Sequence, residues 1–415
     1  MKRKALPFDW GLVIASTLVM SGFYGTYHTF SVFLKPILEE LVWTRAVTSG
    51  AISTSAGVSG LATIIAGRLA DKYGERIIVV IGALLVGLGY LLMSQISSIW
   101  QLYLYFGIII GIGMAACWTP INAAISKRFI EKRILALGIA TSGMTIGQMY
   151  MAPITVHWIT TYGWHIAYIM LAIILILTII PSLKLPGRIT QQIIGIGVRG
   201  RKEEDSKSNQ FEEPTQPNEW SATEAAKTLP FWMLMVTGFA ISTCFYIVIV
   251  HIVAYATDIG IVSTMAALII TIMGGANILG KVVVEYGTNR IGSKSTLFIL
   301  LVLQALALLL FMQASSLWML FAAGSLFGLG NGATSPIRIS MISEFFGFKS
   351  VGTLIGLIDV SWCVGGITGP VLAGYIFDLS QSYDMAFIAG MLLTVIGMIA
   401  TPFLRTPSRQ AGKLW

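Results

Sequence analysis

Charged residues are scarce in this chain of 415 residues: Lys, Arg, Asp and Glu make up 11% of it, and hydrophobic residues make up 55%. A soluble domain carries roughly 25% charged residues. About half of the usual solvating surface is therefore missing, which argues against a soluble protein. Cysteine is also rare, and its three residues lie in apolar runs (Cys117, Cys244 and Cys363). Three such residues provide neither a disulfide framework nor metal-ligand spacing.

Motifs for nucleotide or metal chemistry are absent from the sequence. No glycine-rich loop ends in Gly-Lys-Ser/Thr, and no His and Glu residues cluster with metal-ligand spacing. ATP-driven pumping and metal-dependent hydrolysis therefore lack the residues that carry them. We therefore expect that the protein is not an enzyme and that it binds no cofactor and no metal ion. The net charge of +8 is spread over loops, so no nucleic-acid partner is expected.

Long apolar segments dominate the chain instead. A helix needs about 20 mostly apolar residues to cross a bilayer, and helices satisfy their own backbone groups there. We predict an all-α membrane protein with twelve transmembrane helices. The spans are expected at residues 9–36, 46–70, 76–95, 99–127, 134–158, 164–185, 230–257, 262–287, 294–313, 317–345, 350–377 and 384–404.

The basic residues predict how the chain is oriented. All but four of the 27 Lys and Arg residues lie in the N-terminus, the even-numbered loops or the C-terminus, the exceptions being Lys35, Arg45, Lys281 and Arg338. Basic residues mark the cytoplasmic side. We therefore expect both termini in the cytoplasm, which requires an even number of spans. The predicted location is the cell (plasma) membrane, with multiple passes.

A polar stretch divides the chain into two similar halves. We expect an N-terminal six-helix bundle at 1–185, a cytoplasmic linker at 186–229 and a C-terminal six-helix bundle at 230–415. The stretch 67–76 after the second span recurs at 285–294 after the eighth. Parallel repeats of this kind build a large class of alternating-access transporters, with the substrate site between the halves near the membrane midplane.

The first copy of this repeat points to a family. Residues 67–76, Gly-Arg-Leu-Ala-Asp-Lys-Tyr-Gly-Glu-Arg, resemble the signature loop of the major facilitator superfamily, Gly-x-Leu-x-Asp-Arg/Lys-x-Gly-Arg-Arg/Lys. The resemblance implies the major facilitator fold of two pseudo-symmetric six-helix bundles. It also implies a gating role for the residues that match the motif, with Asp71 bracing the cytoplasmic gate. These residues are Gly67, Asp71, Lys72, Gly74 and Arg76.

A second motif narrows the family. Residues 129–147, Phe-Ile-Glu-Lys-Arg-Ile-Leu-Ala-Leu-Gly-Ile-Ala-Thr-Ser-Gly-Met-Thr-Ile-Gly, resemble the span-five signature of the monocarboxylate transporters, which are lactate and pyruvate proton symporters. The departure is Glu131, where the family prefers a basic residue. Gly143 and Gly147 alone are more often a close packing contact between membrane helices than a mechanistic element. The surrounding Leu-Ala-x-Gly-x-Ala run makes the motif specific.

Ionisable residues within spans are costly and therefore mark candidate sites. Lys281 lies in span eight, with Asn277 one turn earlier on the same face. The monocarboxylate transporters carry Asp-or-Asn-x-x-x-Arg there, and the resemblance implies that the cation binds the substrate carboxylate. Lysine keeps the charge but lacks the bidentate fork of arginine, and its pKa shifts more readily. The alternative is a lysine that snorkels from a helix end.

Four other ionisable residues within spans are candidates for the site. His28 in span one occupies the place of a lysine in family members similar to animal lactate carriers, and a histidine titrates near neutrality, which suits proton coupling. We expect His28 and His251 of span seven to face the cavity as repeat-related partners; the alternative for each is a structural hydrogen-bonded histidine. Asp359 and Arg338 form either a structural ion pair or a site where Asp359 carries the proton. Lys281 is a further candidate for the proton.

The remaining candidates concern the shape and charge of the site. Oxalate–formate exchangers of the same superfamily carry a second cation where this chain has Trp362, next to Cys363. One cation fits a monoanion better than a dianion. Thr119 and Thr145 in spans four and five are expected to offer hydroxyl contacts.

The sequence therefore predicts a secondary active transporter that carries a small monocarboxylate such as lactate or pyruvate by proton-coupled symport. Its partners are the organic anion, a proton and the lipid bilayer, and we expect it to work as a monomer. Two alternatives stay open: an organic-anion exchanger of the formate or oxalate type without proton coupling, and a non-transporting membrane sensor.

Overall fold

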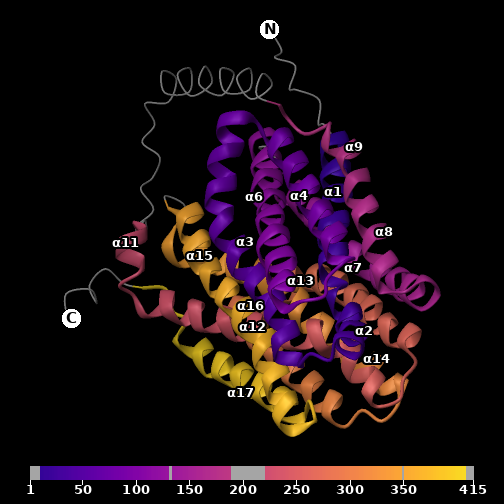
Figure 1. Cartoon of the computed structure of the whole chain (residues 1–415). Helices are drawn as coiled ribbons and strands as arrows, with labels where there is room; N and C mark the ends of the chain where they lie inside the picture. Colours follow the sequence, from indigo (N-terminus) through magenta and orange to yellow (C-terminus); the bar gives the residue numbers. More distant parts are fainter. Residues whose placement is uncertain (1–9, 130–132, 188–219, 348–349, 408–415) are drawn as a thin grey trace. The chain divides into compact units, whose positions relative to one another are not determined.

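The computed structural model describes residues 10–129, 133–187, 220–347 and 350–407, which form helices and turns with no strand among them (Figure 1). In this described part, nine helical segments are long and apolar enough to cross a membrane. The other predicted spans are helical as well, so the chain has the predicted twelve-helix architecture. These other spans are α1 (Trp10–His28) with α2 (Phe30–Leu41), α7 (Arg133–Tyr162), and α14 (Leu317–Gly332) with α15 (Thr334–Phe346).

The nine apolar segments are built from longer helices and a few short ones. Span four begins with a short α-helix and one stretch of π-helix, Tyr103–Ile110. The elements are α3 (Arg45–Tyr73), α4 (Glu75–Met93), α5 (Ile99–Leu102), α6 (Gly111–Arg128), α8 (Trp164–Leu177), α9 (Ile179–Ser182), α12 (Leu229–Asp258), α13 (Ser263–Met312), α16 (Val351–Ser380) and α17 (Asp384–Ala400).

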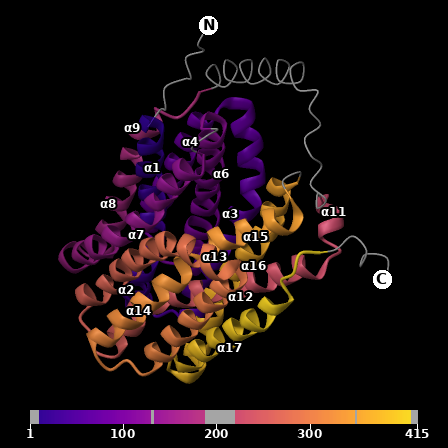
Figure 2. The same ribbon diagram turned by 180° about the vertical axis from the view of Figure 1, so that it is seen from behind.

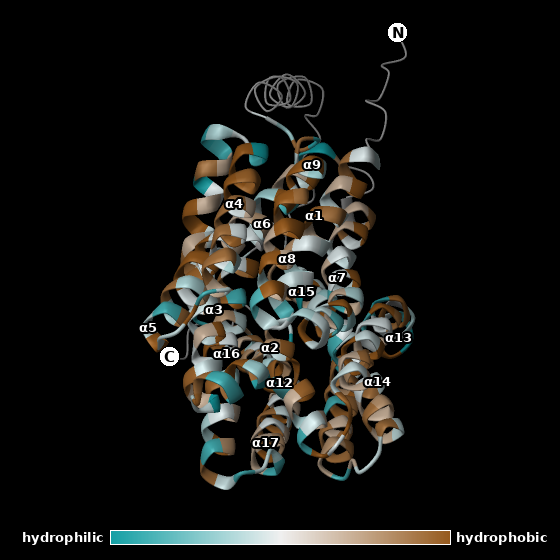
Figure 3. Ribbon diagram, turned by 45° about the vertical axis from the view of Figure 1, so that its right-hand side comes forward, coloured by the Kyte–Doolittle hydropathy of each residue, from teal (hydrophilic) through white to brown (hydrophobic). Residues whose placement is uncertain are grey.

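Apolar residues cover both the inward and the outward faces of these helices. On α4, Val79 and Val86 are fully buried, whereas Leu84 and Leu88 are about half exposed on the other face. A helix in a soluble protein places polar residues on its outer face. An apolar outer face is stable only against lipid, as expected for a span. Figure 3 shows hydrophobic residues along the helices and hydrophilic residues gathered at helix ends.

Two glycines end corresponding spans in the two halves of the sequence. Gly74, between α3 and α4, has φ 98° and ψ 147°. Gly292, inside α13, has φ 83° and ψ 159°. A positive φ of this kind favours glycine, and at Gly292 it divides α13 into two spans. The two glycines occupy matching positions of the predicted repeat, so the two copies share a backbone conformation as well as a sequence pattern.

The end of the predicted linker is ordered. Residues 222–225 form the short helix α11 (Ala222–Ala225), which Ser221 and Glu224 cap reciprocally. Trp220 is buried against Phe346, and its backbone N–H donates to the Phe346 carbonyl. The predicted linker residues 188–219 lie outside the described residues.

The described residues pack as two compact units. One contains 10–29, 58–129, 133–151 and 158–187; the other contains 30–57, 152–157, 220–347 and 350–407. In the first unit α4 packs along α6 and α8; in the second, α12 packs along α16 and α17 (Figures 1 and 2). The second unit thus includes the connection between predicted spans one and two. The expected domain boundaries at 185 and 230 stay a prediction.

Candidate functional site

Lys281 and Asn277 lie one turn apart on α13, and both side chains are partly buried. The end of α14 packs closely here. A Cβ at Gly332 would lie 2.2 Å from the Asn277 carbonyl oxygen, and one at Gly280 would lie 2.7 Å from the Leu329 carbonyl oxygen. Lys281 is eighteen residues into a helix that turns at Gly292, so about 16 Å of helix separates it from that turn. The lysine is therefore set well inside the helix.

An aromatic cluster surrounds Trp362 on α16. The Phe245 ring lies 5.7 Å from it and the Tyr246 ring 6.4 Å, measured between ring centroids. Ser242 donates a hydrogen bond to the Trp362 carbonyl at 2.7 Å. Cys363, the next residue, is partly buried. The structure therefore brings two predicted site residues together with two aromatic residues of α12.

Arg338 on α15 is almost completely buried, with 4% of its surface exposed. Its Nη2 atom donates to the Ser361 hydroxyl at 3.4 Å. A Cβ at Gly238 would lie 2.3 Å from this Nη2 atom, so α12 makes room for the guanidinium through a glycine. Asp359 is exposed on α16, and within the described residues no direct ion pair joins it to Arg338.

His28 ends α1 in the first unit and is buried. Its Nδ1 atom lies 2.9 Å from the Tyr24 carbonyl oxygen and 3.0 Å from the Gln148 amide nitrogen on α7. Nδ1 donates to the carbonyl only when it carries a hydrogen, and it accepts from the amide only when it does not. The two partners therefore favour opposite tautomers. Sequence reasoning missed Gln148, although it lies in the helix of the span-five motif.

The two predicted threonines lie in different surroundings. Thr145 is buried on α7, three residues before Gln148. Thr119 is partly buried on α6, and a Cβ at Gly67 would lie 3.3 Å from its methyl carbon. Thr119 thus packs close to the motif at the end of α3. The role of both threonines as substrate contacts stays a prediction.

The predicted gating motif is built around an ion-pair cluster. Lys127 on α6 contacts the Asp71 carboxylate at 2.9 Å and the Glu75 carboxylate at 3.1 Å. The Glu75 side chain is 1% exposed, whereas that of Asp71 is 70% exposed. Lys127 therefore joins the end of α3 to the start of α4. Sequence reasoning selected Asp71 but missed Glu75, which lies in the same motif, and Lys127, which only the fold brings to it.

The other motif residues support the same turn. The Arg76 side chain donates from Nε to the Leu185 carbonyl at 2.9 Å, and its backbone N–H donates to the Pro186 carbonyl at 3.2 Å. Arg76 thus ties the start of α4 to the residues that follow α9. Lys72 is exposed and lies over the Tyr73 ring, with 5.1 Å between Nζ and the centroid.

His251 on α12 is fully buried in the second unit. Its Nδ1 atom lies 3.0 Å from the Tyr383 hydroxyl and its Nε2 atom 3.0 Å from the Pro370 carbonyl oxygen. Both ring nitrogens are therefore engaged by the protein, as in a structural histidine. His28 and His251 fall in different units, and their predicted pairing across a cavity stays a prediction, as does a substrate contact of His251. Among the described residues no group of three His, Cys, Asp or Glu side chains could hold a metal ion.

Comparison with known proteins assigns the family. The profile of the Major Facilitator Superfamily matches residues 12–287 and 234–414. The chain belongs to the major facilitator superfamily. Solved structures agree in fold: a D-xylose–proton symporter has a TM-score of 0.76 at 13% identity, covering 98% of this chain and 100% of its own. A nucleoside transporter has a TM-score of 0.75 at 13% identity, covering 95% and 99%.

Curated relatives are similar over most of the length. Monocarboxylate transporter 13 of Rattus norvegicus is 27% identical over 411 residues, covering 97% of this chain and 91% of its own. Monocarboxylate transporter 2 of Homo sapiens is 26% identical over 405 residues, covering 92% and 82%. The predicted resemblance to these transporters is confirmed. This major facilitator protein is a multi-pass membrane secondary transporter and not an enzyme.

Proposed function

We propose that this transporter carries a small monocarboxylate such as lactate or pyruvate across the cell membrane together with a proton. The main support for this proposal is the cation Lys281, which is partly buried within α13 and has Asn277 one turn away. An ionisable side chain within a membrane span marks a candidate functional site. A carboxylate is the anion that complements the lysine ammonium. The similarity to two monocarboxylate transporters supports this class of substrate.

The proposed cycle uses these residues in two roles. The Lys281 ammonium binds the substrate carboxylate while the Asn277 amide donates to it, and the rings of Phe245, Tyr246 and Trp362 face its apolar part. A proton on Asp359, His28 or Lys281 offsets negative charge, so that the loaded site is neutral. The loaded protein then alternates between its two openings without carrying excess charge through lipid.

Uptake by proteoliposomes tests the Lys281 role. A charge-assisted hydrogen bond contributes about 1.5–3 kcal/mol, so Lys281→Ala should lower uptake of labelled lactate about 10- to 100-fold. Lys281→Arg should retain much of the uptake, because it keeps the charge. Lys294→Ala removes a cation elsewhere on α13 and should leave uptake unchanged. Full uptake by Lys281→Ala would refute the site.

Proton coupling is tested by the driving force. An inward proton gradient should drive lactate above its equilibrium distribution. An anion exchanger without proton coupling would instead show uptake stimulated by internal anion and indifferent to the pH gradient. A non-transporting sensor would bind lactate and show neither response.

A further inference from the structure

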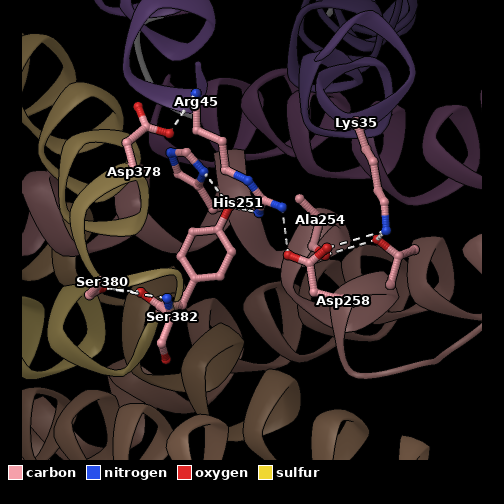
Figure 4. Close-up of polar contacts among 10 residues, drawn as sticks. Lys35, Arg45, His251, Ala254, Asp258, Asp378, Ser380 and Ser382 are labelled. Atoms are coloured by element: carbon pink, nitrogen blue, oxygen red, sulfur yellow. Dashed lines mark hydrogen bonds and ion pairs between the residues drawn. The ribbon is translucent and has the colours of Figure 1, made fainter. Parts of the chain in front are cut away.

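Arg45, at the start of α3, is held by several groups of the second half of the sequence. Its Nη2 atom contacts the Asp258 carboxylate at 2.7 Å, and its Nη1 atom donates to the Tyr383 hydroxyl. The guanidinium carbon lies 3.6 Å above the centre of the Phe377 ring. Only 11% of the Arg45 side chain is exposed. Figure 4 shows the side chain reaching across to Asp258, at the end of α12.

A second cation from the first half of the sequence binds the same carboxylate. Lys35 on α2 contacts Asp258 at 3.2 Å and donates to the Thr257 hydroxyl at 3.4 Å (Figure 4). Asp378 on α16 accepts from the backbone N–H groups of Arg45 at 2.9 Å and Ala46 at 2.8 Å. A carboxylate at a helix N-terminus satisfies free N–H groups and matches the helix dipole. Two cations and two carboxylates thus form a cluster in which the formal charges cancel.

A chain of hydrogen bonds runs from Arg45 through Tyr383 and His251 to the Pro370 carbonyl. Since the Tyr383 oxygen accepts from Arg45, its own hydrogen is available for His251 Nδ1, and His251 Nε2–H donates to the Pro370 carbonyl. Burial raises the pKa of Tyr383, so the phenol keeps its hydrogen. Ser49, one turn into α3, donates to the same Pro370 carbonyl at 3.0 Å. Ser49 from the first half of the sequence and His251 from the second therefore donate to the same carbonyl oxygen.

The backbones of α3 and α16 approach closely beside this cluster. A Cβ at Gly374 would lie 2.7 Å from the Arg45 carbonyl oxygen. Further along, a Cβ at Gly366 would lie 3.1 Å from the Ala56 Cβ. These contacts all belong to the second unit. Arg45 thus sits at one end of a close helix contact that extends at least from residue 45 to residue 56.

We propose that Arg45, with Lys35, Asp258 and Asp378, is a latch that closes the transport pathway at the ends of the spans remote from the chain termini. Alternating access requires the spans of the first half to separate from those of the second at whichever side is open. The latch joins a segment of the first half to two helices of the second, α12 through Asp258 and α16 through Asp378. Charged groups suit such a contact because water solvates each of them once they separate, so the pairs can break and re-form.

Thiol accessibility in whole cells tests the latch and requires no substrate. Ala56→Cys places a thiol in the α3–α16 contact, and a membrane-impermeant maleimide is added outside. We expect slow labelling in this chain and labelling about tenfold faster when Asp258→Asn is added, because loss of a half-buried ion pair shifts the population toward the open state. Lys35→Gln should give a smaller increase, since 33% of Lys35 is exposed. The parent chain, which keeps Ala56, gives the background.

The matched control is Asp384→Asn, the same substitution at an exposed residue that starts α17. It should leave the labelling rate unchanged. Labelling of the Asp258→Asn chain at the rate of the Asp384→Asn chain would overturn the proposal. If Asp258→Asn does not reach the membrane, Arg45→Lys serves instead: it keeps the charge and loses the ring contact, and should still raise labelling.

A covalent lock distinguishes a gate from a static contact. Disulfide-bonded Cβ atoms lie about 3.8 Å apart, so Ala56→Cys with Gly366→Cys should form a disulfide after a small relaxation. Oxidation should abolish transport and reduction should restore it, whereas each single variant should respond to neither treatment. Transport by the oxidised double variant would show that transport does not require α3 and α16 to separate, and would overturn the latch.

Discussion

Among the single residues, Asp359 and Arg338 lie on neighbouring helices but differ in burial, and this difference decides which of them can carry a proton. Arg338 is enclosed by Ser361 and the space at Gly238, whereas Asp359 on the neighbouring helix is exposed and makes no direct ion pair with it within the described residues. An enclosed guanidinium keeps its charge throughout a cycle. An exposed carboxyl can take up and release a proton. Of the two, Asp359 is the better candidate for coupling.

The corresponding prediction concerns Asp359→Asn. An amide resembles the protonated carboxyl but cannot release a proton, so the variant should keep lactate–lactate exchange and lose uphill uptake driven by a proton gradient. In the parent chain, lowering the outside pH should speed uptake because it protonates the coupling group; in the variant this response should disappear. Asp384→Asn should behave like the parent chain. An unchanged pH response in Asp359→Asn would move the coupling role to His28 or Lys281.

The residues that the sequence could not reveal have partners far along the chain. Lys281 and Asn277 were predictable because a helix places residues four apart on one face. Arg45 was visible only as a basic residue in an odd-numbered loop, since its partner Asp258 is more than two hundred positions away. The available signal was that Arg45 and Asp258 both sit at span ends on the same predicted side. No comparable feature of the sequence pointed to Gln148.

At the scale of helices, the span-five glycines explain how α1 and α7 pack within the first unit. A Cβ at Gly143 would lie 2.2 Å from the Thr17 carbonyl oxygen, and one at Gly147 would lie 2.2 Å from the Ser21 carbonyl oxygen. Backbone lies against backbone at both places. Close packing is therefore the physical role of Gly143-x-x-x-Gly147, as the first interpretation of the motif held.

This packing predicts a difference between glycines of the same helix. Gly147→Ala should destabilise the protein by about 1–3 kcal/mol, because a methyl group cannot fit against a carbonyl that has no room to move. Gly138→Ala should be neutral or slightly stabilising, since no atom lies within 4 Å of the added carbon and alanine favours a helix. Thermal unfolding of the purified variants in detergent measures both. Equal melting temperatures would contradict the packing role.

Helix breaks were harder to predict than helices. The sequence predicts one span at 9–36 and another at 317–345, but the first is interrupted at Thr29 and the other at Ala333. Threonine hydroxyls lie at both breaks: Thr29 donates to the Thr26 carbonyl and Thr334 to the Asn331 carbonyl. Such bonds compete with the helical pattern. Hydropathy does not register this competition, so it favours one long helix.

For the whole molecule, the repeat made the architecture predictable. Twelve apolar segments, alternating basic loops and a duplicated signature loop indicate the major facilitator fold without any knowledge of contacts, and the family comparison confirms it. The substrate depends on far fewer groups. It rests on Lys281 and Asn277 of α13.

The most direct test of proton-coupled lactate transport follows lactate and protons in the same vesicles. Purified protein in proteoliposomes with a pH-sensitive dye inside receives an inward lactate gradient, with labelled lactate counted in parallel. Proton-coupled transport requires the lumen to acidify as lactate enters, and the rates of acidification and of lactate entry should fall together in Lys281→Ala. Entry of lactate through the parent chain with no change in luminal pH would contradict proton-coupled carriage, and equal entry through the parent chain and Lys281→Ala would contradict the site.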